Sequence, residues 1–358
     1  MPDTRPGCQR KCGNVSIPYP FGLVGDDPTC FKNDDFKLFC NTAILPPKLT
    51  FYGDYDGDEH TILHISLAAH QLTTSILGSV ICYTGERVSV SYSFPNTYRL
   101  SNTRNRFMAV GCDTYGKLYD YKDSVFYVDC RSSCLNDTEV TASSSCGGFG
   151  CCQTTIPNDL NDFLVSIGSR NGFEYTRNIS RCGLGVLLSD EQDSLFDSQV
   201  SQLWEMRNDV EHLLTVGIST SIILDWAILR NQSCEEAQRS ATTYACGSNT
   251  YCTNSTNGPG YLCNCLQGYQ GNPYLPDGCQ AYLGDGFLLP SIEAPLAGYY
   301  YFSVRQRIKV LVRTSTSVKH WKERFFFVRC PRGSPLPAVL QEPRTKALQL
   351  ALALLTEE

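Results

Sequence analysis

The stretch Cys146-Gly-Gly-Phe-Gly-Cys151-Cys152 places three cysteines within seven residues. Such a cluster is typical of a metal site, a reactive thiol centre or a disulfide framework, and each requires a different fold. A zinc site needs further Cys or His ligands at the right spacing, which the five histidines of the chain do not supply. Adjacent cysteines can hardly bridge each other without strain, so we expect Cys151 and Cys152 each to reach a different, distant strand. Disulfides are therefore the favoured interpretation.

The rest of the chain supports an oxidising compartment. It has 358 residues and 19 cysteines, of which all but Cys330 lie between Cys8 and Cys279. An even, dispersed set of cysteines predicts disulfides in a secreted protein. Glycosylation sequons lie in the same region, at Asn14, Asn136, Asn178, Asn231 and Asn254. We therefore expect an extracellular or cell-wall location, although the first residues show no secretory leader and no segment is apolar enough to span a membrane.

Short strands dominate the predicted secondary structure. Residues 88–94 alternate between polar and apolar side chains, whereas residues 106–112, 125–130 and 222–228 are typical of buried strands. One short helix is expected, over Ser198–Arg207. The fold class that follows is all-β and disulfide-rich, with a short-strand, β-sandwich-like N-terminal region.

The last six paired cysteines form a separate module. Between Cys234 and Cys279 their spacing is C-x11-C-x5-C-x10-C-x-C-x13-C, and a Gly-Tyr pair follows at residues 268–269. A segment this short cannot bury enough apolar surface without cross-links. Spacing alone leaves fifteen pairings open. The pattern resembles an EGF-like module, and that resemblance implies the bridges Cys234–Cys252, Cys246–Cys263 and Cys265–Cys279. The acidic residues of calcium-binding EGF-like modules are missing before Cys234, so no metal or other cofactor is expected.

Four motifs extend the resemblance to a known family. The string CGNVSIPYPFG at residues 12–22 resembles the galacturonan-binding signature of plant wall-associated receptor kinases. Three further pieces follow in the order that this family shows: AVGCDT at residues 109–114, GCCQTTIP at 150–157 and LDWAI at 224–228. The resemblance implies an extracellular region that stops before the membrane helix and the kinase, because no kinase motif is present in the chain.

These observations predict four parts: a galacturonan-binding-like cysteine-rich domain over 8–112, a wall-associated-kinase-type β domain over 113–230, an EGF-like module over 231–280 and a tail over 281–358. Charge changes at the last boundary. Residues 1–280 hold 19 Lys and Arg against 30 Asp and Glu, whereas residues 281–358 hold 11 against 6. The tail resembles gag-like fragments of plant retroelements and is expected to be disordered. Its basic and aromatic residues do not by themselves indicate a nucleic-acid partner.

An acidic polysaccharide requires basic side chains for its carboxylates and aromatic faces for its sugar rings. The densest basic run contains Arg99, Arg104 and Arg106, with Tyr98 beside it. Lys11, Lys32 and Lys37 are the second set of candidates, because they lie in the segment that resembles the galacturonan-binding signature; Lys48 lies there too. The alternative for each of these residues is an ordinary solvated surface charge.

Catalytic patterns are weak by comparison. His60 and His64 have zincin spacing but lack the intervening Glu, and the acidic run at residues 54–59 lacks the positions of a calcium loop. No nucleophile elbow is present. We therefore expect a non-enzymatic module that binds pectin or oligogalacturonides. The alternative is a receptor fragment that binds an extracellular protein or peptide through the EGF-like module, and a secreted hydrolase is a weaker third possibility.

Overall fold

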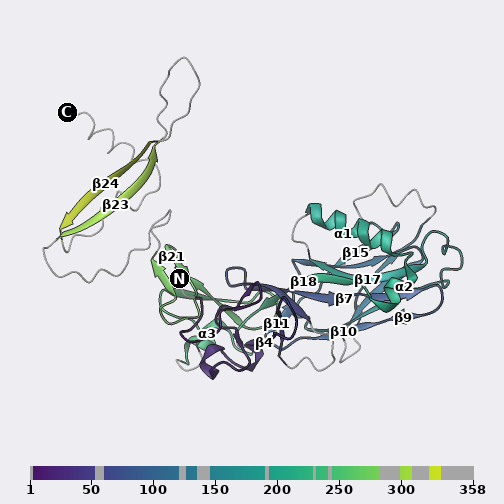
Figure 1. Ribbon diagram of the computed structural model, residues 1–358, viewed down its shortest axis with the longest axis horizontal. Coiled ribbons are helices and arrows are strands. Elements are labelled where there is room, and N and C mark those ends of the chain that lie inside the picture. Colours follow the sequence, from purple (N-terminus) through teal and green to yellow (C-terminus); the bar gives the residue numbers. More distant parts are fainter. Residues whose placement is uncertain are drawn as a thin grey trace, which may run out of the picture. The chain divides into compact units, whose positions relative to one another are not determined.

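The computed structural model describes residues 3–52, 60–120, 126–134, 146–189, 193–228, 231–240 and 244–281, together with two strands nearer the C-terminus (Figure 1). Residues Met1–Leu288 form one compact unit and Leu289–Glu358 form another. The boundary expected at residues 112–113 does not separate two units, because strands from both sides of it pair in the same sheets. The EGF-like module also lies inside the first unit.

The second unit contains one described element, an antiparallel hairpin of β23 (Tyr299–Ile308) and β24 (Lys322–Pro331). The remainder of residues 282–358 lies outside the described residues.

Strands β3 to β7 from the N-terminal part of the chain, together with β11 and β18, form a seven-stranded sheet. Its strand order is β11-β18-β7-β6-β5-β4-β3, and only β3 and β4 pair in parallel. A two-stranded hairpin of β1 (Lys11–Cys12) and β2 (Val15–Ser16) packs near β6. The strands of the sheet are β3 (Gly22–Leu23), β4 (Lys37–Asn41), β5 (Lys48–Phe51), β6 (Thr61–Ser66), β7 (Gln71–Leu77), β11 (Tyr98–Leu100) and β18 (Ser219–Trp226). Two short 3-10 helices, Pro28–Cys30 and Asp34–Phe36, lie between β3 and β4.

Two further sheets pack face to face. One has the order β15-β12-β17-β8-β9 and the other β10-β16-β13-β14. Gly116 permits their close approach, because a Cβ atom there would lie 2.8 Å from the Phe107 ring. The strands of the first are β8 (Ser79–Cys82), β9 (Arg87–Val88), β12 (Asn105–Val110), β15 (Cys151–Thr155) and β17 (Cys182–Ser189); those of the second are β10 (Val90–Ser93), β13 (Thr114–Tyr119), β14 (Phe126–Ser132) and β16 (Asp162–Ser169).

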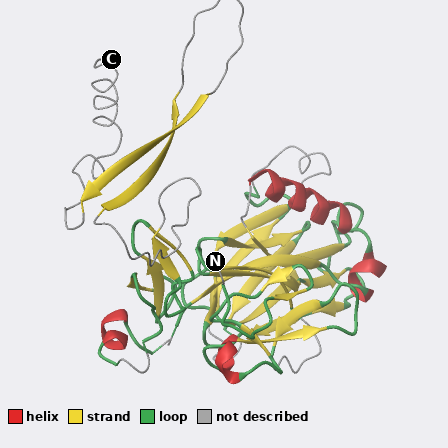
Figure 2. Cartoon of the chain, turned by 60° about the vertical axis from the view of Figure 1, so that its left-hand side comes forward, coloured by secondary structure: helices red, strands yellow, loops and turns green. Residues whose placement is uncertain are grey.

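Helices α1 (Asp193–Met206) and α2 (Val210–Thr215) cover the other face of the five-stranded sheet (Figure 2). Leu203 of α1 and Leu213 of α2 pack with Val186 and Leu188 of β17 in one buried cluster. Every residue of β17 is buried, as expected for a strand covered on both faces. The helix predicted over 198–207 is therefore present but begins earlier, and α2 was not predicted.

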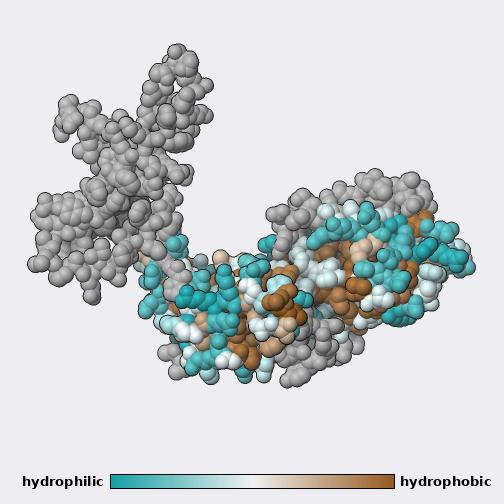
Figure 3. Space-filling model, viewed as in Figure 1, coloured by the Kyte–Doolittle hydropathy of each residue, from teal (hydrophilic) through white to brown (hydrophobic). Residues whose placement is uncertain are grey.

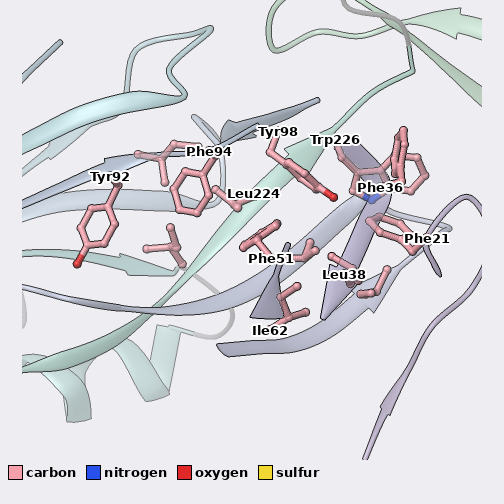
Figure 4. Close-up of a cluster of buried hydrophobic side chains, with 14 of the residues drawn as sticks. Phe21, Phe36, Leu38, Phe51, Ile62, Tyr92, Phe94, Tyr98, Leu224 and Trp226 are labelled. Carbon is pink, nitrogen blue, oxygen red and sulfur yellow. The ribbon is translucent and has the colours of Figure 1, made fainter. Parts of the chain in front are cut away.

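The main core is rich in aromatic side chains. The rings of Phe21 and Phe36 each meet Trp226 edge to face (Figure 4). Their centroids lie 5.2 and 5.9 Å, respectively, from the centroid of the Trp226 ring. Tyr98 and Phe51 extend this aromatic cluster toward the middle of the sheet, with an edge-to-face contact between their rings. Phe21 belongs to the CGNVSIPYPFG string and Trp226 to the LDWAI string, so these two motifs meet in the core.

Nine disulfides join all eighteen cysteines between Cys8 and Cys279. Cys82 and Cys182 are direct cross-strand partners on β8 and β17. The bridges are Cys8–Cys30, Cys12–Cys40, Cys82–Cys182, Cys112–Cys134, Cys130–Cys152, Cys146–Cys151, Cys234–Cys252, Cys246–Cys263 and Cys265–Cys279. The prediction of an all-β, disulfide-rich fold is confirmed, and the last three bridges are those that the EGF-like resemblance implied.

One expectation about the opening stretch is wrong. Cys152 reaches a separate strand, through Cys130 of β14, but Cys151 bonds to Cys146 only five residues earlier. The glycines between them explain the difference. Gly148 and Gly150 have positive φ angles of 109° and 72°, and the Gly148 amide donates to the Cys151 carbonyl at 2.9 Å. The chain therefore turns back on itself within the motif.

The EGF-like module consists of one short helix and two small hairpins. Helix α3 (Cys234–Gln238) begins with a capping box between Ser233 and Glu236. The hairpins pair β19 (Thr250–Asn254) with β20 (Tyr261–Cys265), and β21 (Tyr269–Gly271) with β22 (Cys279–Ala281). Tyr261 and Tyr274 are buried in the same core as the seven-stranded sheet, so the module is firmly docked.

Candidate ligand-binding groove

A groove of about 760 Å³ lies between the EGF-like module and the N-terminal strands. The β1–β2 hairpin and the end of β6 form one side, and β20 and β21 form the other. Its charged and aromatic lining residues are Asp3, Arg10, Lys11, His64, His70 and Tyr251. The groove therefore joins segments that lie more than 180 residues apart in the sequence.

Arg10 and Lys11 give the groove its positive charge. Both side chains are exposed, and neither forms an ion pair with another described residue. The β1–β2 pairing of Lys11 with Ser16 holds this segment at the rim. Two adjacent cations with no ion-pair partner in the described part of the chain can bind the carboxylates of an acidic ligand.

Polar and aromatic residues of the EGF-like module also line this groove. Tyr251 of β19 is exposed, and Asn264 and Gln270 also line the groove. Amides can donate to and accept from sugar hydroxyls, while an exposed ring offers a flat face to a pyranose. This combination suits a polyhydroxylated, negatively charged ligand.

His70 lines the groove and connects its two sides. Its Nε2 donates a hydrogen bond of 3.0 Å to the carbonyl oxygen of Cys263, and its ring packs against Trp226 and Tyr274. Burial lowers the pKa of the His70 imidazole, although this hydrogen bond acts in the opposite direction. The neutral ring thus connects the N-terminal sheet to the EGF-like module without adding charge.

The basic run predicted around residue 99 lies elsewhere and is largely structural. Arg99 is only 3% exposed; its Nε lies 2.5 Å from Asp159 Oδ1, and its Nη1 donates to the Asn96 carbonyl at 2.8 Å. Tyr98 is fully buried and donates to the Asp35 carbonyl at 3.0 Å. Burial raises the pKa of Tyr98 well above its ordinary value.

Arg104 and Arg106 are half-buried, before and on β12, and do not line the groove. The structure therefore does not bring the three arginines together with Lys11.

The other two lysine candidates are also dispersed. Lys32 is half-buried, and burial together with the nearby Arg5 lowers its pKa. Lys37 lies on β4, where its Nζ is 2.6 Å from Asp34 Oδ1. Of the sequence-predicted residues, only Lys11 lies in the groove. Arg10, His64 and Tyr251 were missed because only tertiary contacts bring them together.

A second hollow, of about 830 Å³, is chemically different. Its described lining contains Asp35 and Glu236 but no Lys or Arg, and it also contains the sequon residues Asn231 and Asn254. An anionic ligand would be repelled there. The first groove is therefore the better candidate.

The remaining predicted features can also be placed. Asn14, Asn178, Asn231 and Asn254 are exposed, whereas Asn136 and the acidic run at 54–59 lie outside the described residues. His60 contacts the rings of Tyr92 and Phe94. Among the described residues, no cluster of three metal-binding side chains occurs, and no helix is long and apolar enough to cross a bilayer.

The cystine framework, the docked EGF-like module and the groove define a disulfide-braced β module with a candidate binding site. Residues 8–76 match the family described as wall-associated receptor kinase galacturonan-binding. The chain is also 32% identical over 278 residues to wall-associated receptor kinase 2 of Arabidopsis thaliana, covering 76% of this chain and 34% of that relative. Wall-associated receptor kinase 3 of the same plant is 30% identical over 290 residues, covering 75% of this chain and 35% of the relative. No solved structure matches the chain.

These matches relate the chain to the extracellular region of the wall-associated receptor kinases, as the sequence motifs predicted. The chain spans about a third of the length of the curated relatives that it matches. The matched region is the galacturonan-binding part of the family and not its kinase.

Proposed function

We propose that this chain is a non-catalytic binding module that faces the cell wall and recognises pectic polysaccharide or its oligogalacturonide fragments. The observation that carries the proposal is the groove that Arg10 and Lys11 line together with Tyr251, Asn264 and Gln270. Uronate carboxylates would contact the two cations, and the sugar rings would lie against the aromatic face. The name of the matched family supports the same ligand class.

Local charge is important because the whole protein is acidic. With a formal net charge of −6, the chain repels a polyanion at long range. Binding must therefore depend on short-range contacts at the groove, and we expect its affinity to fall as the salt concentration rises.

Calorimetric titration with trigalacturonate tests the proposal directly. The double substitution of Arg10→Ala and Lys11→Ala should reduce affinity about tenfold, the effect of losing roughly 1.4 kcal/mol. Arg87→Ala with Arg181→Ala is the matched control, because both arginines are exposed and do not line the groove. Equal loss in the two double variants, or no binding by the native chain, would overturn the assignment.

The alternative partner is an extracellular protein or peptide bound through the EGF-like module. It would require saturable binding that survives the Arg10→Ala and Lys11→Ala substitutions and is not displaced by oligogalacturonide. Release of reducing sugar from pectin would instead revive the hydrolase alternative.

The proposal includes glycosylation at the exposed sequons Asn14, Asn178, Asn231 and Asn254, and at Asn136. Glycans on Asn231 and Asn254 would fill the second hollow and leave the first groove open. Mass spectrometry of glycopeptides from the plant-expressed chain would show which sites carry sugar.

A further inference from the structure

The second hollow, of about 830 Å³, lies where the EGF-like module meets two segments of the N-terminal region. Asp35, in the second 3-10 helix, and Asn33, directly before that helix, line it from one segment. Asn96, in the turn before β11, lines it from the other, and Gln232 and Asn254 line it from the module. The hollow therefore spans a joint between parts of the chain that are far apart in the sequence.

The lining of this hollow suits a neutral sugar. Apart from Pro259 and two glycines, every residue in its described lining has a polar side chain, and amides and hydroxyls predominate. No exposed large hydrophobic side chain of the described residues lies there, and Figure 3 shows mainly hydrophilic residues over the EGF-like module on the side in view. Amides and hydroxyls donate to and accept from sugar hydroxyls, whereas the centre of a protein interface is usually apolar.

Asn254 is the acceptor of the sequon Asn254-Ser-Thr256, and its side chain is already oriented. Its Oδ1 accepts a hydrogen bond of 2.7 Å from the Cys234 amide, and the residue ends β19, where it pairs with Tyr261. Its Nδ2 makes no hydrogen bond within the described part of the chain. Because a glycan is attached to Nδ2, Oδ1 can keep its contact with Cys234 in the glycosylated protein.

Two polar side chains of the lining lack hydrogen bonds that a sugar can supply. The Oε1 atom of Gln232 is buried and has no partner among the described residues. Asn33 is exposed, and its side chain does not cap the 3-10 helix that it precedes. An unpaired buried acceptor destabilises the folded state. The acetamide N–H and the hydroxyls of N-acetylglucosamine are suitable donors for both side chains.

The loop that follows the sequon asparagine holds the module against the sheet. Asn257 donates to the Leu100 carbonyl at 3.0 Å and to Asp225 Oδ2 at 2.9 Å, and its side chain is buried. Ser255 and Gly258, on either side of it, line the hollow. A sugar in the hollow would therefore lie beside the contacts that dock the module.

We propose that the hollow seats the first sugars of a glycan on Asn254, and that these sugars connect the EGF-like module to the segment around Asn33. Attachment joins Nδ2 to the anomeric carbon of N-acetylglucosamine; Nδ2 loses a proton, and the diphosphate of a lipid-linked donor leaves with the bonding electron pair. This inference rests on the glycosylation included in the proposed function and does not depend on the acidic ligand. The glycan thus stabilises the docked module from within the joint.

Thr256→Ala is the main test, because it removes the sequon but keeps the Asn254 side chain and its contact with Cys234. It should lower the melting temperature, measured by calorimetry with the disulfides intact, by about 2 to 4 °C. Asn178→Gln is the matched control, because it removes an exposed sequon that does not line the hollow, and it should leave the melting temperature unchanged. Mass spectrometry of glycopeptides from the native chain shows whether Asn254 carries sugar.

A second measurement locates the sugar. Asn33→Ala should lower the melting temperature of the glycosylated protein but not that of the Thr256→Ala variant, because only a seated glycan gives the Asn33 side chain a partner. If Thr256→Ala is not secreted, the comparison of Asn33→Ala with the native glycosylated chain still tests the seat, and equal melting temperatures would overturn it.

The outcomes separate the seat from glycosylation itself. If Asn254 carries no sugar, both the glycosylation at this site and its seat are wrong. If it carries sugar but Thr256→Ala melts at the native temperature, or no lower than Asn178→Gln, the glycosylation stands and the seat is wrong. A larger loss from Asn231→Gln than from Thr256→Ala would give the hollow to the other glycan and overturn the assignment to Asn254.

Discussion

The side-chain amide of Asn272, in the EGF-like module, donates a hydrogen bond of 2.6 Å to the carbonyl oxygen of Tyr19 near the N-terminus. The same nitrogen donates to the Asp3 carbonyl at 2.8 Å, and Asn272 is fully buried. One side chain thus fixes the module against the segment that carries the PYPFG string. This contact and the hydrogen bond of the buried His70 to Cys263 connect the two sides of the groove.

We expect Asn272→Ala to destabilise the protein by about 1 to 3 kcal/mol, because it removes this donor from the Tyr19 carbonyl and the acceptor of the buried Tyr274 amide. The Asp3 carbonyl still accepts a hydrogen bond from the Tyr19 amide. Urea unfolding with the disulfides intact would measure the change in the free energy of unfolding. Gln280→Ala, which removes an exposed amide from the same module, is the control and should change it by less than about 0.5 kcal/mol. Equal stability of the two variants would show that Asn272 does not anchor the module.

Stability should also depend on His70. Burial lowers the pKa of His70 in the folded state below the value of about 6.5 that it has in the unfolded chain. Between these two pKa values the unfolded chain binds a proton that the folded protein does not. The contribution of His70 is therefore complete above about pH 6.5 and is lost as pH falls through the lower folded-state pKa. Because the chain holds four other histidines, the measurement is the difference between native protein and His70→Gln, which keeps a donor for Cys263. A parallel pH dependence in both proteins would contradict this role.

Arg99 gives a prediction that separates stability from binding. Arg99→Ala removes a buried guanidinium that contacts Asp159 and the Asn96 carbonyl, and should cost about 2 to 3 kcal/mol of folding stability. Arg99→Lys should recover only part of this, because an ammonium lacks the planar fork of donors. The folded fraction should bind trigalacturonate with native affinity. A stable variant that has lost binding would instead restore Arg99 as a ligand residue.

The disulfides should contribute unequally to stability. Cys82–Cys182 closes a loop with a sequence separation of 100, whereas Cys146–Cys151 closes one of 5. Loop-closure entropy predicts losses of about 4.7 and about 2 kcal/mol when each pair is replaced by alanine. Thermal unfolding of the two double variants checks this order. If removing the Cys146–Cys151 bridge costs more stability, then the contribution of this bridge depends on the turn that it closes and not on loop-closure entropy.

Local patterns in the sequence were sufficient for the fold class. Period-two alternation located the strand around Val90, continuous apolar runs located β12 and β18, and cysteine spacing identified the EGF-like module. These signals act over a few residues and need no tertiary information. The glycines in the opening stretch carried a signal of the same kind. Their freedom to adopt positive φ allows the Cys146–Cys151 bridge, which cysteine spacing alone did not reveal.

Long-range contacts explain what could not be predicted. Arg99 looked like part of an exposed basic run, but its partner Asp159 is sixty residues away and its strand is buried. The groove depends on Lys11 and Tyr251, which meet only because the EGF-like module docks beside the first hairpin. No local pattern marks such a surface, so charge density in the sequence favoured a different segment.

The Cys82–Cys182 bridge has a further consequence for the fate of the chain outside the cell. A protease that cuts once anywhere between these residues produces two polypeptides that remain covalently linked, side by side on paired strands. The nicked protein would therefore keep its size until it is reduced. A receptor surface built in this way can lose backbone continuity in an exposed loop and still remain assembled.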